Sequence, residues 1–122
     1  MGYESRIYVV YPHKHEYNGN AHIWAEKLAC MDLAKMGYEN GWRNLFKKDI
    51  EYKLYVNDTD TEFDTDMYGE HLKSCPIQEV INWLEKEMER SDYRRLKPLY
   101  ALLKAYDPEH WGNDIEVVHF GY

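Results

Sequence analysis

Hydrophobic and polar positions alternate with a period of two at both ends of the chain, a pattern typical of β-strands. Near the N-terminus, residues 5–11 place Ile7 and Val9 on one face, and Pro12 follows directly. We therefore predict a first strand that ends at this proline. Near the C-terminus, residues 114–122 alternate in the same way and predict the last strand.

A helical spacing follows the first strand. Residues 21–36 carry large side chains at i, i+4, i+7 and i+11, namely Trp24, Leu28, Met31 and Lys35. This spacing predicts a helix, with Asn20 as its N-cap and Gly37 just beyond its last turn. Residues 38–49 are less regular and predict a short amphipathic turn.

The middle of the chain predicts a β-hairpin. Apolar and polar residues alternate over residues 50–56 and again over residues 61–68. Residues 57–60, Asn-Asp-Thr-Asp, have the composition of a turn. Two alternating runs joined by such a turn are typical of a hairpin.

Two more helices are predicted in the second half. The first begins near Pro76 and has a single apolar stripe, made by Ile77, Val80, Ile81, Leu84 and Met88. Pro98 disfavours a continuous helix, so we predict a break at residues 95–97. The second helix then carries Leu99, Leu102, Leu103 and Tyr106.

The predicted order is strand, helix, strand, strand, helix, strand. This is the order of the ferredoxin-like arrangement, in which helices cover one face of an antiparallel sheet. We predict one α+β domain over residues 1–122, built as a two-layer sandwich with a sheet of about four strands.

Composition narrows the functional classes. The chain has 22 acidic and 15 basic residues, a net charge of −7. This charge repels phosphate backbones and disfavours direct binding of nucleic acid, whereas it favours a basic protein partner. The sequence shows no membrane span and no signal peptide, and Cys30 and Cys75 are expected to be free thiols, so we expect a cytoplasmic protein.

The most distinctive predicted surface is an acidic strand face. In the predicted topology, one sheet face stays open and carries Tyr8 from the first strand. The candidate binding residues beside it are Asp58, Asp60, Glu62, Asp64, Asp66 and Tyr68. The alternative is that these carboxylates merely solvate an exposed strand.

Two groups of residues suggest metal chemistry. Asp64 and Asp66 would lie about 7 Å apart on one side of a strand, as carboxylates do around Mg²⁺ in some nucleases. Three imidazoles, those of His13, His15 and His119, would meet if the first and last strands were neighbours, and could bind Zn²⁺. The first strand supplies no third acid, which is evidence against the Mg²⁺ site. The alternative to the Zn²⁺ site is that all three histidines have an ordinary surface or packing role. No nucleophile elbow, phosphate-binding loop or dinucleotide motif is present, so we expect no cofactor.

Aromatic residues are abundant, with twelve tyrosines and four tryptophans. Trp42 and Trp111 fall in predicted loops, where aromatic side chains often form protein interfaces. The alternative is that tyrosine and tryptophan fill the core of a chain with few phenylalanines.

A short resemblance adds a context. The opening sequence GYESRIYVV, residues 2–10, resembles the start of small uncharacterised proteins carried by phages and mobile elements of Gram-positive bacteria. Such proteins share no activity to transfer, but the resemblance implies a phage accessory or anti-defence protein, for example an inhibitor of CRISPR nucleases.

Three hypotheses follow. The first is a non-enzymatic binding module that covers a basic nucleic-acid-binding surface on a partner protein. The second is a metal-dependent nuclease or hydrolase that uses Asp64 and Asp66 or the histidines. The third is a homodimer joined through a sheet edge.

Overall fold

The computed structural model describes residues 4–39, 41–55, 59, 61–106, 108–111 and 114–122. The elements are β1 (Ser5–Tyr17), β2 (Asn20–Ala34), the short 3₁₀ helices η1 (Lys35–Tyr38) and η2 (Arg43–Leu45), β3 (Lys48–Asp49), β4 (Leu54–Tyr55), β5 (Glu62–Phe63), β6 (Lys73–Pro76), α1 (Ile77–Glu87), α2 (Leu96–Lys104), α3 (Pro108–Trp111) and β7 (Glu116–Gly121).

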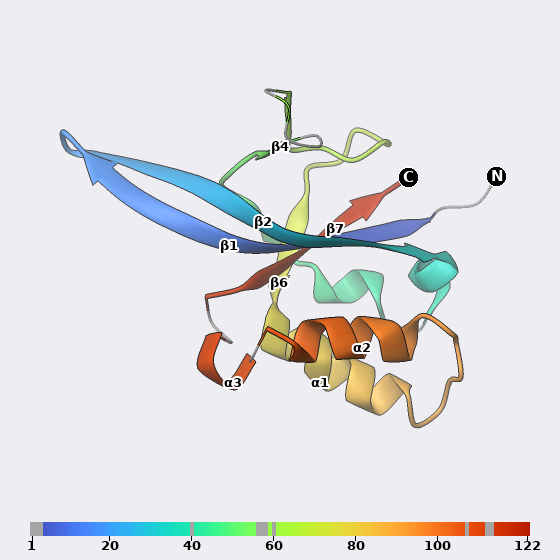
Figure 1. Ribbon diagram of the computed structural model, residues 1–122. Coiled ribbons are helices and arrows are strands. Elements are labelled where there is room, and N and C mark those ends of the chain that lie inside the picture. The colour runs from blue at the N-terminus through green and yellow to red at the C-terminus, as the bar shows by residue number, and fades with distance from the viewer. Residues whose placement is uncertain (1–3, 40, 56–58, 60, 107, 112–113) are drawn as a thin grey trace.

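The centre of the fold is a five-stranded antiparallel sheet with the order β2-β1-β7-β6-β3. Helices α1 and α2 cover one face of this sheet, and the short β4–β5 pair lies on the other side (Figure 1). The predicted α+β class with helices on one face is confirmed. The predicted strand-helix-strand-strand-helix-strand order is wrong, because two strands precede every helix, and the sheet is larger than about four strands.

Each face of the sheet has its own core. On the helical side, Ile7, Val9 and Val117 of the sheet pack against α1 and α2 in a cluster that includes Leu84 and Trp42. The other core lies under the described residues of the segment 50–72, which we call the flap. Its buried members are Tyr8, Val10, Ile50, Tyr52, Leu54, Leu72, Val118 and Phe120. The sheet is therefore covered on both sides over the inner half of β1.

The predicted helix over residues 21–36 is wrong, because residues 21–34 belong to strand β2 and the last two residues begin the 3₁₀ helix η1. Val9 pairs with Ala29 and Val10 pairs with Lys27, so Leu28 is an extra residue, a β-bulge. Before the bulge, the even-numbered residues 24 and 26 lie on the sheet face that the helices cover. After the bulge, the odd-numbered residues 29 and 31 lie on that face. Because it inserts one residue into a period of two, the large side chains fall at intervals that imitate a helix.

The predicted first strand is confirmed, but it does not end at Pro12. β1 continues to Tyr17 and pairs with β2 along its whole length. β7 pairs with β1 only as far as Val10. Beyond Val10 this side of β1 has no neighbouring strand in the described part of the chain, so a residue without an N–H is tolerated at Pro12.

The predicted central hairpin exists only as a short ladder. Leu54 pairs with Phe63 and Tyr55 pairs with Glu62, and Thr65 adds a single bridge to His71. The predicted burial is nevertheless correct over residues 50–55, where Ile50, Tyr52 and Leu54 are buried and the intervening residues are exposed. These apolar residues pack onto the sheet, and a long ladder is not required to bury them.

The two predicted helices of the second half are confirmed. The four residues Ile77, Val80, Ile81 and Leu84 of α1 are buried, and α2 begins at Leu96, so that Pro98 lies in its first turn. The first-turn N–H groups have no acceptor within a helix, which explains why proline is tolerated there.

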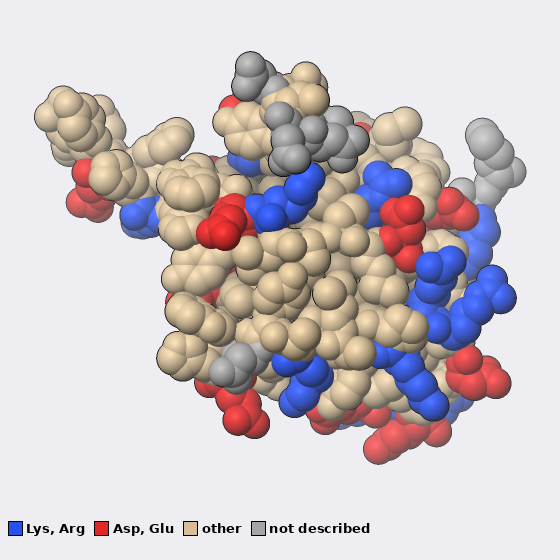
Figure 2. Space-filling model, viewed as in Figure 1, with Lys and Arg blue, Asp and Glu red and all other residues tan. Residues whose placement is uncertain are grey.

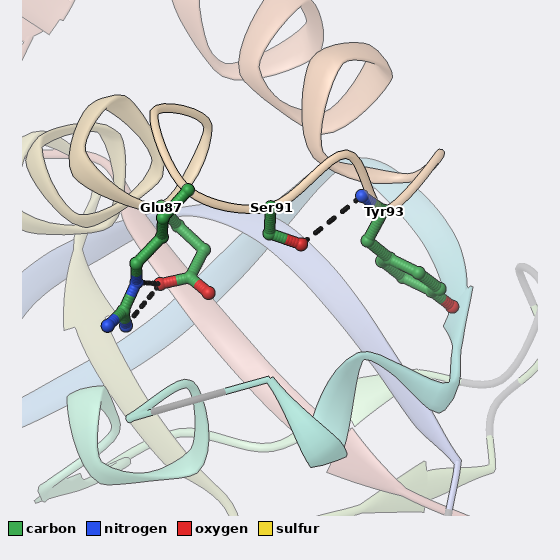
Figure 3. A network of polar contacts seen from close by, with 4 residues as sticks. Glu87, Ser91 and Tyr93 are labelled. Atoms are coloured by element: carbon green, nitrogen blue, oxygen red, sulfur yellow. Dashed lines mark hydrogen bonds and ion pairs between the residues drawn. The ribbon is translucent and has the colours of Figure 1, made fainter.

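The segment between α1 and α2 is held by polar contacts (Figure 3). The guanidinium of Arg90 donates to the buried Glu87, and Ser91 Oγ accepts from the backbone N–H of Tyr93 at 3.3 Å. The hydroxyl of Tyr93 in turn donates to the carbonyl of Leu33 at 3.0 Å. The connection is thereby fastened to the end of β2.

Candidate functional site

The part of the molecule that leaves the body is the far end of the β1–β2 hairpin. We call residues 11–26 the arm, because they lie beyond the last pairing of β1 with β7. The arm extends away from the sheet and helices as a two-stranded ribbon (Figure 1). Every residue from 14 to 22 is exposed.

A tight turn sets the register of the arm. Asn18 and Gly19 connect the strands, with φ of 51° and 81°. Positive φ at both central residues is the geometry of a type I′ turn, for which Asn-Gly is the preferred sequence. The pairing then runs without a shift from Tyr17 opposite Asn20 to Tyr11 opposite Glu26.

One face of the arm collects aromatic and imidazole side chains, and we call it the aromatic face. Alternation and register place on it Tyr11, His13, His15 and Tyr17 from β1 and Asn20, His22, Trp24 and Glu26 from β2. His13 stacks on Trp24 with ring centroids 4.2 Å apart, and its Nε2–H donates to Glu26 Oε1 at 3.1 Å. Tyr11 contacts Trp111 edge to face at 5.8 Å, which fastens the base of this face to α3.

The tip of the arm exposes large rings. Tyr17 is 70% exposed and Trp24 is 46% exposed. In the space-filling view the arm protrudes and carries mainly uncharged side chains, whereas acidic and basic side chains are interspersed over the body (Figure 2). The arm therefore presents accessible aromatic area on a protruding element.

The predicted acidic face is only partly free. The carboxylate of Glu62 accepts from the hydroxyl of Tyr55 at 2.8 Å and lies 3.9 Å from Lys53. The carboxylate of Asp66 accepts from the backbone N–H groups of Tyr68 and Glu70, at 2.8 and 3.1 Å, and so holds its own turn.

Asp64 is half-buried, and Asp58 and Asp60 lie outside the described residues. The strand expected to present this whole series is only two residues long, Glu62–Phe63. The prediction of one continuous acidic strand face is therefore wrong for the described carboxylates.

The predicted aromatic site residues fall into three environments. Trp42 is fully buried in the helix-covered core, packed against Phe46 and Trp83, so its placement in a docking loop is wrong. Tyr8 lies under the flap and is only 7% exposed. Tyr68 and Trp111 are on the surface, as predicted, but at separate places, in the flap and on α3.

A groove of about 510 Å³ separates the flap from the edge of the sheet. Its walls are mostly rings, including Tyr8, Phe63 and Phe120, whose centroids lie 5.6 to 6.1 Å apart. The side chains of Arg6 and Lys27 already lie over rings of the groove, with Arg6 Cζ 4.5 Å from the centroid of Tyr122. Because these rings contact one another and the protein's own cations, we assign the groove a packing role.

A second hollow, of about 440 Å³, is polar and has His119 in its wall. His119 Nε2 is hydrogen-bonded to Ser5 Oγ at 2.9 Å, and Ser5 is fully buried. Burial lowers the pKa of His119 to about 4, Arg43 lowers it further, and Asp66 acts in the opposite direction. A hydroxyl that no substrate reaches cannot serve as a nucleophile, so this serine–histidine pair is structural in the folded chain.

The predicted cluster of three histidines does not form. His119 lies opposite Ile7, whereas His13 is six residues further along β1, on the order of 20 Å away at the rise of a strand. Over the residues that the structure describes, no group of three or more His, Cys, Asp or Glu side chains is arranged to hold a metal ion.

The cysteines offer no activated nucleophile. Both are free, with Cys30 exposed and Cys75 buried. Burial raises the pKa of Cys75 to about 12, and a hydrogen bond to Glu79 raises it as well. The residue Cys30 is exposed as a whole, but its thiol is partly buried, and this partial burial raises its pKa above the ordinary value. Both thiols therefore stay protonated near neutral pH.

The sequence pattern did not predict the arm, because the first strand was expected to end at Pro12 and residues 21–36 were expected to form a helix. The signal for the arm was the Asn18-Gly19 pair, the strongest short-range indication of a hairpin, with Tyr17 just before it.

Comparison with known proteins identified no relative of this chain. The chain matches no protein-family model, no curated protein and no solved structure. In the described part of the chain, no helix is long and apolar enough to cross a membrane.

Proposed function

We propose that the protein is a non-enzymatic binding module that docks on a partner protein through the aromatic face of its arm. The observation that carries this proposal is the exposure of Tyr17 and Trp24 on a ribbon that projects beyond the body. The proposal moves the docking surface of the sequence-based hypothesis from the acidic segment to the arm.

The exposed arm is energetically costly for the isolated chain. An isolated two-stranded ribbon is marginally stable in water, so the arm gains little by pairing alone. Tyr17 and Trp24 place apolar area in solvent where folding does not use it. Tyrosine and tryptophan bury large areas with few bonds to immobilise, which makes them frequent energetic centres of interfaces.

The charge of the chain indicates the kind of partner. A net charge of −7 favours approach to a basic surface. Glu62 and Asp64 would act at longer range, by accelerating association, rather than in the buried contact. In its specific form, the proposal is a phage accessory or anti-defence protein that blocks a basic nucleic-acid-binding surface on the partner, as the opening residues suggested.

The test uses matched double variants. The native chain and its Tyr17→Ser/Trp24→Ser variant are used to capture partners from host extract, and the affinity for the captured protein is then measured. Each residue should contribute as an interface hot spot, so we expect a loss of about 30-fold or more per substitution. Met67→Ser/Tyr68→Ser is the control, because it removes two exposed flap residues and should leave the affinity unchanged.

A third variant separates the charge from the contact. Glu62→Gln/Asp64→Asn should slow association and weaken its dependence on salt, while dissociation stays unchanged. Retention of full affinity by the Tyr17→Ser/Trp24→Ser variant would refute docking through the arm. Partner binding lost only in the charge variant would return the docking surface to the flap.

A further inference from the structure

Two histidines of the arm lie directly opposite each other. His15 on β1 is the cross-strand partner of His22 on β2. Directly opposed residues of an antiparallel pair project from the same face, with Cβ atoms about 4.5 to 5.5 Å apart. The Asn18-Gly19 turn fixes this register, so the pairing of the two imidazoles is built into the hairpin.

Among the described residues these two imidazoles have no bonding or stacking partner, in contrast to His13. Within the described part of the chain, neither His15 nor His22 takes part in a hydrogen bond, an ion pair or a ring contact, and both are exposed. His13, on the same face, is held by stacking on Trp24 and by its bond to Glu26. Exposed side chains change rotamer on the picosecond to nanosecond scale, so both free rings can turn toward a common point.

We propose that His15 and His22 together bind a divalent transition-metal cation of the zinc class. Neutral imidazole suits Zn²⁺, Ni²⁺ and Cu²⁺, and a metal–nitrogen bond is about 2.0 to 2.1 Å long. Two Cβ atoms at cross-strand spacing allow both ring nitrogens to reach one ion. The pair supplies two positions of the coordination sphere, and water completes it, which accords with the absence of any group of three or more ligands in the described chain.

The site has consequences for the arm and for what approaches it. A chelate between the two strands ties the ribbon near its tip, and binding to the folded state stabilises that state. The positions held by water are open to exchange, so a donor atom of a docked molecule can complete the coordination. This inference concerns metal binding by the chain alone and does not depend on the proposed protein partner.

Titration calorimetry of the untagged chain with Zn²⁺ and with Ni²⁺ tests the site. We expect one ion per chain, a loss of affinity of about tenfold or more in His15→Asn and in His22→Asn alike, and no binding of Mg²⁺, which prefers oxygen ligands. His13→Asn is the matched control: it removes a histidine from the same face and should leave the affinity unchanged. All three positions lie on the arm, so circular dichroism should show an unchanged fold.

Several results would overturn the inference. One such result is that the native chain shows no heat of binding with either cation. Another is that the affinity for the cation is unchanged in both His15→Asn and His22→Asn. An equal loss in His13→Asn would also overturn the assignment to the pair. Amide exchange gives a second measurement, because Zn²⁺ should slow exchange over residues 14–22 in the native chain and in His13→Asn, but not in His15→Asn.

Discussion

The inner and outer halves of β1 are one continuous strand, yet they have opposite environments. From Ser5 to Val10, β1 lies between β2 and β7, and its side chains enter the two cores on either face. From Lys14 to Tyr17, the same strand pairs only with β2 and is exposed. The strand itself does not differ; what differs is the presence of β7, the helices and the flap. Buried contacts therefore concentrate in the inner half, and the outer half is left exposed to solvent.

The largest effect should come from emptying the core beside the inner half. Trp42 is fully buried, so Trp42→Ala should lower the free energy of unfolding by about 3 to 5 kcal/mol, measured by urea titration. Its indole N–H has no hydrogen-bond partner within the described chain, so Trp42→Phe loses no hydrogen bond and should cost less. Trp111→Ala, at an exposed position, should change stability far less than Trp42→Ala. If Trp42→Ala were as mild as Trp111→Ala, the core assignment of Trp42 would be wrong.

A pH dependence of stability is expected from His119, which lies opposite Ile7 in the inner half. In the unfolded chain this imidazole takes up a proton near its ordinary pKa of 6.5, whereas in the folded chain burial lowers the pKa to about 4. The unfolded state thus binds more protons between these values, and the free energy of unfolding falls as the pH drops through them. The loss from this group reaches at most about 3 kcal/mol.

The measurement for His119 is a difference between two chains. Urea titrations of the native protein and of His119→Gln, from neutral pH down to about pH 4, cancel the carboxylates common to both. The native chain should lose more stability over this range than the variant. Parallel curves would mean that His119 is not held neutral by burial.

The smallest of these effects should appear only in the arm. Gly19 has φ of 81°, and among the described residues, its two chain neighbours aside, no atom lies within 4 Å of the position that a Cβ would take, so Gly19→Ala strains the backbone without a clash. We expect a local cost of about 1 kcal/mol, seen as faster amide exchange over residues 14–22 with an unchanged midpoint for the body. Gly69→Ala has the same φ in the flap and should leave arm exchange unchanged. An equal loss throughout the body would show that arm and body unfold together.

The success of the sequence-based predictions followed the range of the interactions. α1 and α2 were predicted because their apolar stripes repeat at helical spacing against one surface. β2 was predicted as a helix because its bulge at Leu28 is a feature of the pairing between β1 and β2. A local sequence pattern does not contain information on that pairing. Residues 50–55 were predicted with the right buried positions and the wrong ladder, because burial follows hydrophobicity whereas pairing depends on a distant neighbour.

The candidate site shows the same division. Tyr68 and Trp111 were correctly expected at the surface. Trp42 was also expected there but is buried, because a tryptophan in an irregular segment is exposed or buried according to what packs on it. The three-histidine cluster failed because strand pairing placed His119 far from His13. The pair of His15 and His22 was invisible until the register of β1 and β2 was known.

The amino-acid sequence alone determined the α+β class, the amphipathic helices, the buried positions within residues 50–55, and the net charge, since each depends on composition or on local spacing. Tertiary contacts settle where β7 stops along β1, which carboxylates are already bonded, and which histidines face each other. The physical reason is that a strand becomes core or surface through neighbours that lie far away in the chain.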